Sequence, residues 1–300
     1  MLHQSMLSHT SLLPPLLLLI YSLGFSASTS QAQALQERIL EKGYTVMEDS
    51  EASFLYNNNG AYIMGINLEK MKIQSFQKLD STHEAKPSLY LEGIESPYYQ
   101  RIDYQEVIEK YKEQIIINAS FFENYEASTP LSYPIFDGTE WISGGSSPYG
   151  PVNEPINDYY GKIDLLALHI DSNHAFIQPY AKESSPSTFM MVSQNYSDHP
   201  AKVLANNRFT RFLLVTTYDQ NEDGLDEWLI FSIGFGQITT RAEELLSLIP
   251  EKEIMTLDGG SSVLLYHPSH GVLHHPVNYT SADDTEQVNS LPHYLLFAPK

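Results

Sequence analysis

The sequence predicts an α+β fold, in which a strand-rich single domain contains a mixed β-sheet and a few helices. Most apolar runs are short, rich in Val, Ile, Phe and Tyr, and bounded by Gly, Pro, Asn or Asp, as is typical of strands. Only two or three segments have the spacing of an amphipathic helix. The chain has 300 residues, of which 42% are hydrophobic and 18% charged, enough for one large domain with its own core.

The N-terminal segment differs from the rest of the chain. Its first 34 residues contain no Asp, Glu, Lys or Arg, and residues 12–25 form an apolar run. The small residues Ala32-Gln33-Ala34 follow, as a signal peptidase requires. We therefore expect a signal peptide over residues 1–34 and one domain over 35–300. Because the apolar run could also stay in the chain, a retained N-terminal anchor is the alternative.

Charge and cysteine content narrow the class of protein. The net charge is −20, from 17 basic and 37 acidic residues. Such a surface repels nucleic acid and anionic lipid, so we expect no nucleic-acid partner and no stable membrane association after signal cleavage. The chain has no cysteine, which excludes a disulfide scaffold. Together with the signal peptide, this predicts a secreted or periplasmic protein of bacterial rather than eukaryotic type.

The first half of the chain is mostly strand-like. A short helix is expected over residues 35–42, where Gly43 ends it. Residues 44–79 have a strand pattern that is interrupted by a turn signal at residues 57–60. A helix is expected over 104–114, followed by a buried strand over 115–117 that is β-branched throughout.

The second half begins with a segment rich in Gly, Pro, Ser and Tyr. This segment, residues 124–156, predicts a long loop of the kind that often carries function. A hairpin is expected over 162–177, with its turn at residues 171–173. Further strands are expected over 189–192, 212–218, 228–233, 254–257 and 291–298, and a helix over 241–249 that Pro250 ends.

The segment Leu257-Asp258-Gly259-Gly260-Ser261-Ser262 combines several chemical groups at the end of a strand. Glycine allows a sharp turn and a close approach of ligand to backbone, and successive amides can bind an anion. One carboxylate beside amide and hydroxyl donors suits a substrate with an anionic group next to a reactive carbon. A plain Asp-Gly-Gly hairpin turn is the alternative.

Two further polar positions accompany apolar strands. Asn118 ends the strand over 115–117 and begins Asn118-Ala119-Ser120-Phe121-Phe122. A buried Asn needs hydrogen bonds, and it could orient a sugar hydroxyl or a phosphate oxygen, or cap a turn. Arg208 and Arg211 precede the strand over 212–218, where an arginine needs a partner such as a phosphate or a structural carboxylate.

Taken in order, these segments resemble the phosphodiester glycosidase family, which includes the lysosomal "uncovering enzyme" and exported bacterial proteins. Residues 118–122 are similar to its Asn-Gly-Gly-Phe-Phe motif, with Ala119 at the first glycine. Residues 257–262 are similar to Leu-Asp-Gly-Gly-Gly-Ser, with Ser262 at the serine. Residues 236–245, with Thr239, Thr240 and Glu244, are similar to its Gly-x-Thr/Ser-x-x-Glu-Leu-Ala motif. The Arg-Thr-Ala-Ile-Gly motif is kept only at Arg211, with departures at Phe212 and Val215.

The resemblance implies a hydrolase that cleaves a sugar 1-phosphodiester between the anomeric carbon and the phosphate oxygen. Its substrate would be a carbohydrate or glycan phosphodiester. The implied catalytic residues are Asp258, Asn118 and Arg211, and the implied substrate-binding residues are Gly259, Gly260, Ser262, Ser120 and Thr239. The motif departures leave open a non-catalytic polysaccharide-binding domain. A phosphodiesterase that breaks the P–O bond is the third reading.

Two segments could hold a metal ion. Asp219, Asn221 and Asp223 place oxygen atoms at every second position before Gly224, as a calcium loop does. Because Ile230 stands at the twelfth position, we expect a shorter hairpin loop closed by Asp226 or Glu227, with a bare acidic turn as the alternative. Zinc is not expected, since the spacing of the four histidines at 267, 270, 274 and 275 matches no standard motif. That segment is expected to be a loop at the rim of the site.

Overall fold

A computed structural model describes residues 35–123, 126–146, 164–181, 186, 188–196, 207–277 and 289–300. The expected signal peptide and residues 124, 125 and 147–156 of the expected loop lie outside these residues. Within them, no helix is long and apolar enough to cross a bilayer.

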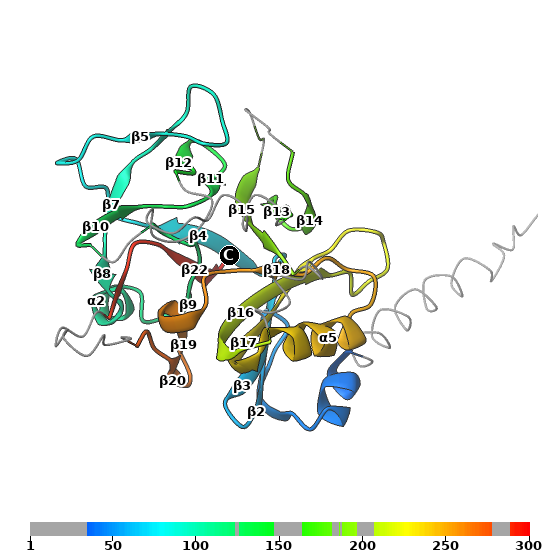
Figure 1. Ribbon diagram of the computed structural model, residues 1–300. Helices are drawn as coiled ribbons and strands as arrows, with labels where there is room; N and C mark the ends of the chain where they lie inside the picture. The colour runs from blue at the N-terminus through cyan, green and yellow to red at the C-terminus, as the bar shows by residue number, and fades with distance from the viewer. Residues whose placement is uncertain are drawn as a thin grey trace, which may run out of the picture.

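The larger sheet has eleven strands (Figure 1). Its main path runs, in spatial order, β1 (Thr45–Asp49), β2 (Ser53–Asn58), β3 (Ala61–Asn67), β17 (Trp228–Gln237), β16 (Phe209–Tyr218), β18 (Met255–Thr256), β15 (Phe189–Asn195), β11 (Pro134–Phe136) and β12 (Trp141–Gly144). The hairpin of β13 (Leu165–Ile170) and β14 (Ala175–Pro179) joins this sheet at β15.

The smaller sheet has five strands, in the order β20 (Gly271–His274), β19 (Leu265–His267), β9 (Ile115–Asn118), β22 (Tyr294–Pro299) and β4 (Met71–Phe76). Three two-stranded pairs accompany it: β10 (Ser128–Pro130) with β7 (Tyr98–Gln100), β21 (Ser290–Leu291) with β8 (Ile102–Asp103), and β5 (Lys86–Pro87) with β6 (Glu95–Ser96). The helices among the described residues are 35–41, α2 (Tyr104–Lys110), α5 (Ile238–Leu248) and the 3-10 turn η1 (Gly260–Ser262).

The expectation of a mixed sheet is wrong for the described strands, because every pairing between them is antiparallel. Strands β17 and β18, which α5 connects, do run in the same direction, since both pair antiparallel with β16. They are not neighbours, because β16 lies between them and pairs with both. The fold is therefore mainly β, with its helices at the margins.

The central strands are buried on both faces. On β16, Leu213 and Val215 point into a core shared by the two sheets, while Phe212 and Leu214 point to the opposite face. That opposite face is covered by α5 and by the helix over 35–41 (Figure 1). Burial on both faces explains why these strands read as continuous apolar runs rather than as alternating ones.

Several element boundaries differ from the expected ones. Helix α2 ends at Lys110 rather than residue 114, because Tyr111 leaves the helical conformation and its ring contacts Phe76, with centroids 5.2 Å apart. The last expected strand is divided into β21 and β22. Short strands β10, β11 and β12 occupy described parts of the segment that was expected to be a loop.

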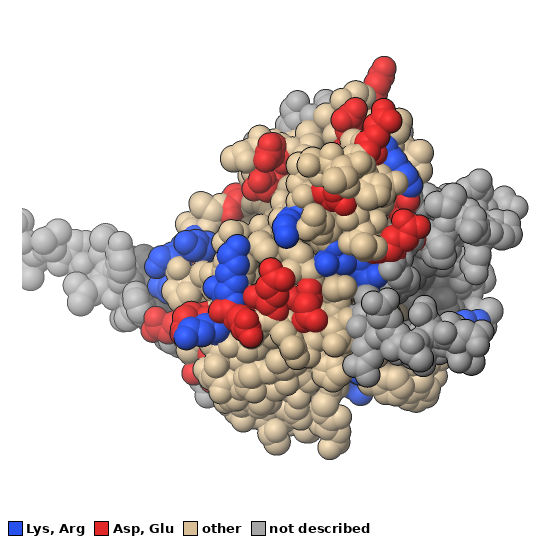
Figure 2. Space-filling view, turned by 90° about the vertical axis from the view of Figure 1, so that its left-hand side faces the viewer, with Lys and Arg blue, Asp and Glu red and all other residues tan. Residues whose placement is uncertain are grey.

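Charges of both signs lie on the face in Figure 2, where Lys and Arg stand among Asp and Glu. On this side, the net charge of −20 is therefore not carried by a uniformly acidic surface.

Candidate functional site

Asp258 lies where the two sheets meet. The strand that delivers it, β18, pairs with β16 and β15 of the larger sheet. The Leu257 amide donates to the Leu213 carbonyl of β16 at 2.9 Å, and the Asp258 amide donates to the Ala119 carbonyl, just after β9, at 3.0 Å. The two consecutive amides that lead into Asp258 are thus bonded to β16 of the larger sheet and to the residue after β9 of the smaller sheet.

The two glycines after Asp258 serve different purposes. A side chain at Gly259 would bring its Cβ to 3.1 Å from the carbonyl oxygen of Arg211, so the backbones of β16 and this turn approach closely there. Gly260 faces open space but has a φ of 62°, in the left-handed region that favours glycine. The turn then continues into η1, in which the Ser262 amide donates to the Gly259 carbonyl at 3.2 Å.

Asn118 holds this turn in place with both ends of its amide. Its Nδ2 donates to the carbonyl of Asp258 at 2.6 Å, and its Oδ1 accepts from the amide of Leu264 at 2.9 Å. The side chain is 1% exposed. Asn118 therefore positions the segment from Asp258 to Leu264, and its expected contact with substrate stays a prediction.

The Asp258 carboxyl group has altered acidity. Its residue is 9% exposed, and this burial raises its pKa to about 7, whereas a hydrogen bond with the Ser262 side chain acts in the opposite direction. Burial disfavours the charged form of a carboxyl group. A pKa in this range suits a general acid or base that acts near neutral pH.

The backbone of Arg211 lies next to the same turn. Besides the close approach of its carbonyl to Gly259, its guanidinium Nη1 donates to the His275 carbonyl at 2.5 Å. The amide of Val277 in turn donates to the Ser261 carbonyl at 2.9 Å. The segment of residues 275–277 thus connects the guanidinium with the turn, and Asn118, Arg211 and Asp258 lie around one segment.

Ser120 takes part in a buried hydrogen-bond chain that the sequence does not reveal. Its hydroxyl is 2.9 Å from Nδ1 of His293, and Nε2 of the same ring is 2.6 Å from the Ser75 hydroxyl. Ser75 also donates to Gln77 at 3.1 Å. Burial lowers the pKa of His293 to about 3, so this ring is neutral at physiological pH. A single histidine before the last strand gives no spacing signal, and only pairing of β22 with β9 brings it to Ser120.

Thr239 bonds to Asn207 and not to a residue of the Asp258 turn. It lies in the first turn of α5, and its hydroxyl donates to the Asn207 side chain at 2.5 Å. In the same helix, Arg241 forms an ion pair of 2.8 Å with Glu244, which also accepts from the Tyr44 hydroxyl at 3.2 Å. This motif secures the helix, and the substrate contact of Thr239 stays a prediction.

The acidic loop between β16 and β17 is closed by hydrogen bonds between its own side chains and backbone amides. The Asp219 carboxylate accepts from the Gly224 amide at 2.8 Å, and Asn221 and Asp223 each accept from the amide two residues later at 2.9 Å. Glu227 is 5% exposed and accepts from the Gln220 amide at 3.1 Å, and burial raises its pKa to about 7. Asp226, the other expected closing residue, pairs with Lys252 at 2.5 Å.

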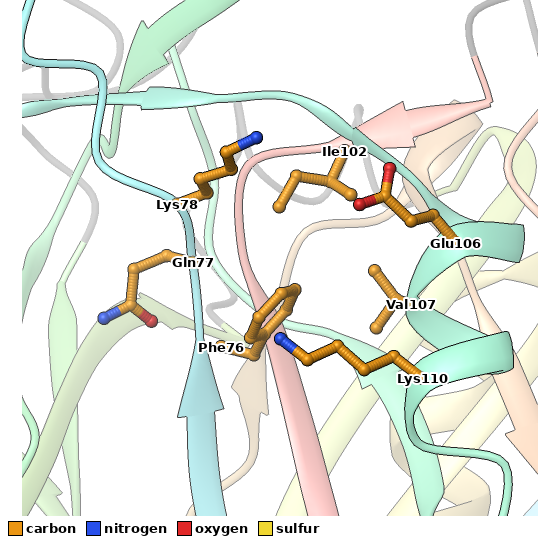
Figure 3. Close-up of a pocket in the computed structure, with 7 residues that line it drawn as sticks. All are labelled: Phe76, Gln77, Lys78, Ile102, Glu106, Val107 and Lys110. Atoms are coloured by element: carbon orange, nitrogen blue, oxygen red, sulfur yellow. The ribbon is translucent and has the colours of Figure 1, made fainter.

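A cavity of about 400 Å³ lies beside the end of β4 and α2, and Asp258 is not among its lining residues. Its wall includes Gln77, the last member of the chain from Ser120. Figure 3 shows the apolar side chains of Phe76, Ile102 and Val107 facing one another, with Lys78, Lys110 and Glu106 around them.

Comparisons with known proteins identify no family for this chain. No family model matches the sequence, and no curated protein matches it. Among solved structures, the catalytic domain of zebrafish N-acetylglucosamine-1-phosphodiester alpha-N-acetylglucosaminidase, auto-inhibited by its pro-peptide, is similar with a TM-score of 0.48 and 10% identity, over 84% of this chain and 80% of that one. A hypothetical protein from Synechocystis has a TM-score of 0.42 and 10% identity, over 85% of this chain and 63% of that one, which is less than two thirds of its length. A putative exported protein from Burkholderia pseudomallei has a TM-score of 0.34 and 8% identity, over 82% and 74%.

Proposed function

We propose that this chain is an exported hydrolase that cleaves a sugar 1-phosphodiester, of the GlcNAc-1-phosphodiester type, between the anomeric carbon and the phosphate oxygen. The observation that carries the proposal is the Asp258 carboxyl group, which is buried, has a pKa of about 7 and precedes a turn of two glycines. The motif resemblance supplies the substrate class. The geometry supports it by bringing Asn118 and Arg211 to the same turn.

The chemistry requires one group that accepts a proton and one site that holds an anion. Water attacks the anomeric carbon, its proton passes to ionised Asp258, and the bond from that carbon to the phosphate oxygen breaks. The electron pair of that bond leaves with the phosphate monoester, which is a weak base and needs little help from a general acid. The amides of Gly259 and Gly260 and the Arg211 guanidinium would stabilise the phosphate.

Asn118 and Ser262 keep this arrangement in place. Asn118 holds the backbone of the turn from both sides, and Ser262 hydrogen-bonds to the Asp258 carboxyl group. A preorganised carboxylate needs no rearrangement during the reaction. In this proposal Asn118 and Ser262 position the turn and the carboxyl group, and Asp258 alone accepts the proton.

The test compares wild-type protein with Asp258→Asn on a GlcNAc-1-phosphodiester. Removal of a general base lowers turnover by about 100-fold to 10,000-fold. Asp80→Asn is the matched control, since Asp80 is also buried and bonded to a serine, Ser128, but lies away from this turn. Turnover by Asp258→Asn at the wild-type rate would remove Asp258 from catalysis.

The same assay separates the two alternatives. A polysaccharide-binding domain would bind the sugar without any turnover by wild-type protein. A phosphodiesterase would release product in which oxygen from labelled water enters the phosphate, whereas the proposed glycosidase places that label on the sugar.

We also propose that the loop from Asp219 to Glu227 binds a structural calcium ion. The observation that favours this is the hydrogen bond from the Gly224 amide to Asp219, which closes the turn, so that bound calcium would have to draw the acidic side chains of the loop together. Hard oxygen ligands of this kind suit calcium.

A further inference from the structure

Among the residues that the structure describes, one group of three His, Asp or Glu side chains has ligand atoms within 4.8 Å of one another: Glu48, His267 and His270. The Nε2 atoms of His267 and His270 lie 3.6 and 3.8 Å from Oε2 of Glu48. The two imidazole rings are 5.2 Å apart between centroids. Three ligand atoms therefore converge from segments that are far apart in the sequence.

A tight hairpin turn brings the two histidines together. The His270 amide donates to the His267 carbonyl at 3.1 Å, which closes a β-turn with Pro268 as its second residue. Gly271 follows with a φ of 73° and pairs with His267, as in a three-residue hairpin loop. The first and fourth residues of such a turn are neighbours, so the sequence His-Pro-Ser-His-Gly directs both imidazoles to one side.

A β-bulge directs the carboxylate toward them. In β1, Val46 pairs with Tyr56 but Glu48 pairs with Leu55, so the register shifts between these residues. A bulge of this kind changes the direction of the side chains that follow it. The other carboxylate oxygen of Glu48 accepts from the Ser53 hydroxyl at 3.2 Å, which fixes its orientation.

His270 supplies a second, independent observation. Its Nε2 atom is buried and has no hydrogen-bond partner, although the side chain as a whole is 24% exposed. A buried nitrogen without a partner is unfavourable, so its position toward Glu48 and His267 calls for a ligand.

Histidine spacing alone predicts no zinc here, but with Glu48 as a third ligand from β1 we propose that Glu48, His267 and His270 form a binding site for a divalent transition metal, with zinc as its best fit. Zinc prefers imidazole nitrogen and carboxylate oxygen at about 2.0–2.2 Å, which places tetrahedral neighbours about 3.4 Å apart. The observed 3.6 and 3.8 Å require only a slight contraction. Calcium is disfavoured, because it selects oxygen ligands.

The metal would join the two sheets. Glu48 belongs to β1, at the edge of the larger sheet, and His267 ends β19 of the smaller one. Three protein ligands leave the fourth position to water, as in zinc sites that are open to solvent. Coordination by Nε2 moves the ring proton of His267 to Nδ1, which ends the long contact of 3.3 Å with the Ser269 amide. This contact is weak, so its loss opposes binding only slightly.

The experiment uses the full chain after treatment with a chelator and dialysis. Zinc is titrated by calorimetry, and cobalt(II) serves as a visible probe of tetrahedral coordination. Wild-type protein is expected to bind one zinc per chain and to unfold at a higher temperature with zinc. His270→Ala and Glu48→Gln are each expected to weaken binding about tenfold or more and to lose the thermal response.

His174→Ala is the matched control, because His174 lies 3.6 Å from Asp171 in a pair that belongs to no group of three ligands within the described part of the chain. It is expected to bind zinc as wild-type protein does. Circular dichroism establishes that each variant is folded, and Glu48→Gln keeps the size and the hydrogen-bonding capacity of the side chain. Absence of stoichiometric zinc binding by wild-type protein would overturn the proposal, as would binding by His270→Ala with wild-type affinity.

Discussion

Replacement of Asn118 by alanine tests whether this side chain holds the candidate site together. The change removes two hydrogen bonds, to the Asp258 carbonyl and from the Leu264 amide. Asn118 is 1% exposed, so both backbone groups would be left buried without a partner. Each such group destabilises a protein by about 1–3 kcal/mol, so the free energy of unfolding is expected to fall by about 2–6 kcal/mol.

Urea denaturation measures this loss. At a slope of about 3 kcal/mol per molar urea, the midpoint is expected to fall by about 0.7–2 M. Asn67→Ala is the control, because the Asn67 side chain also bonds to two backbone groups, the Glu51 carbonyl and the Glu69 amide. Those bonds are only partly buried, so the freed groups reach water and the loss is expected to be smaller. An Asn118→Ala variant within about 1 kcal/mol of wild-type stability would refute the positioning role.

Three further predictions concern the same turn and the acidic loop. Burial raises the pKa of Asp258 to about 7, so from about pH 4 to about pH 7 the unfolded chain loses this proton while the folded protein keeps it, and the free energy of unfolding falls by about 1.4 kcal/mol per pH unit. Asp258→Asn lacks this loss and is expected to gain about 4 kcal/mol on wild-type protein over that interval. Parallel pH-dependences of stability, measured in urea, would contradict it. Gly259→Ala brings a Cβ to 3.1 Å from the Arg211 carbonyl oxygen and is expected to lower the free energy of unfolding by about 1–3 kcal/mol. An unchanged thermal midpoint would show that β16 and the turn can move apart at little energetic cost. Calcium is expected to raise the melting temperature of wild-type protein but not of Asp219→Ala; wild-type protein that does not respond to calcium would exclude the site.

Much of the secondary structure follows from local pattern. Short apolar or aromatic runs predict β2, β3, β9, β16 and β17, and Asn57 to Gly60 predicts the turn between the first two. These elements could be predicted because alternation, turn residues and helix spacing are properties of neighbouring residues. The direction of pairing could not be predicted from local pattern. After β17, helix α5 returns the chain to β18 on the far side of β16, and this path is decided by the packing of whole strands.

The candidate site shows the same division. The sequence by itself determined that a carboxylate, two glycines and two serines follow a strand, and that two histidines flank Pro268 and Ser269. Only the tertiary structure decided that Asn118, 140 residues from Asp258, holds that turn. It also decided that Glu48 faces the histidines and that burial moves the Asp258 pKa to about 7. The physical reason is that burial and long-range hydrogen bonds depend on which strands become neighbours, and no local pattern contains that information.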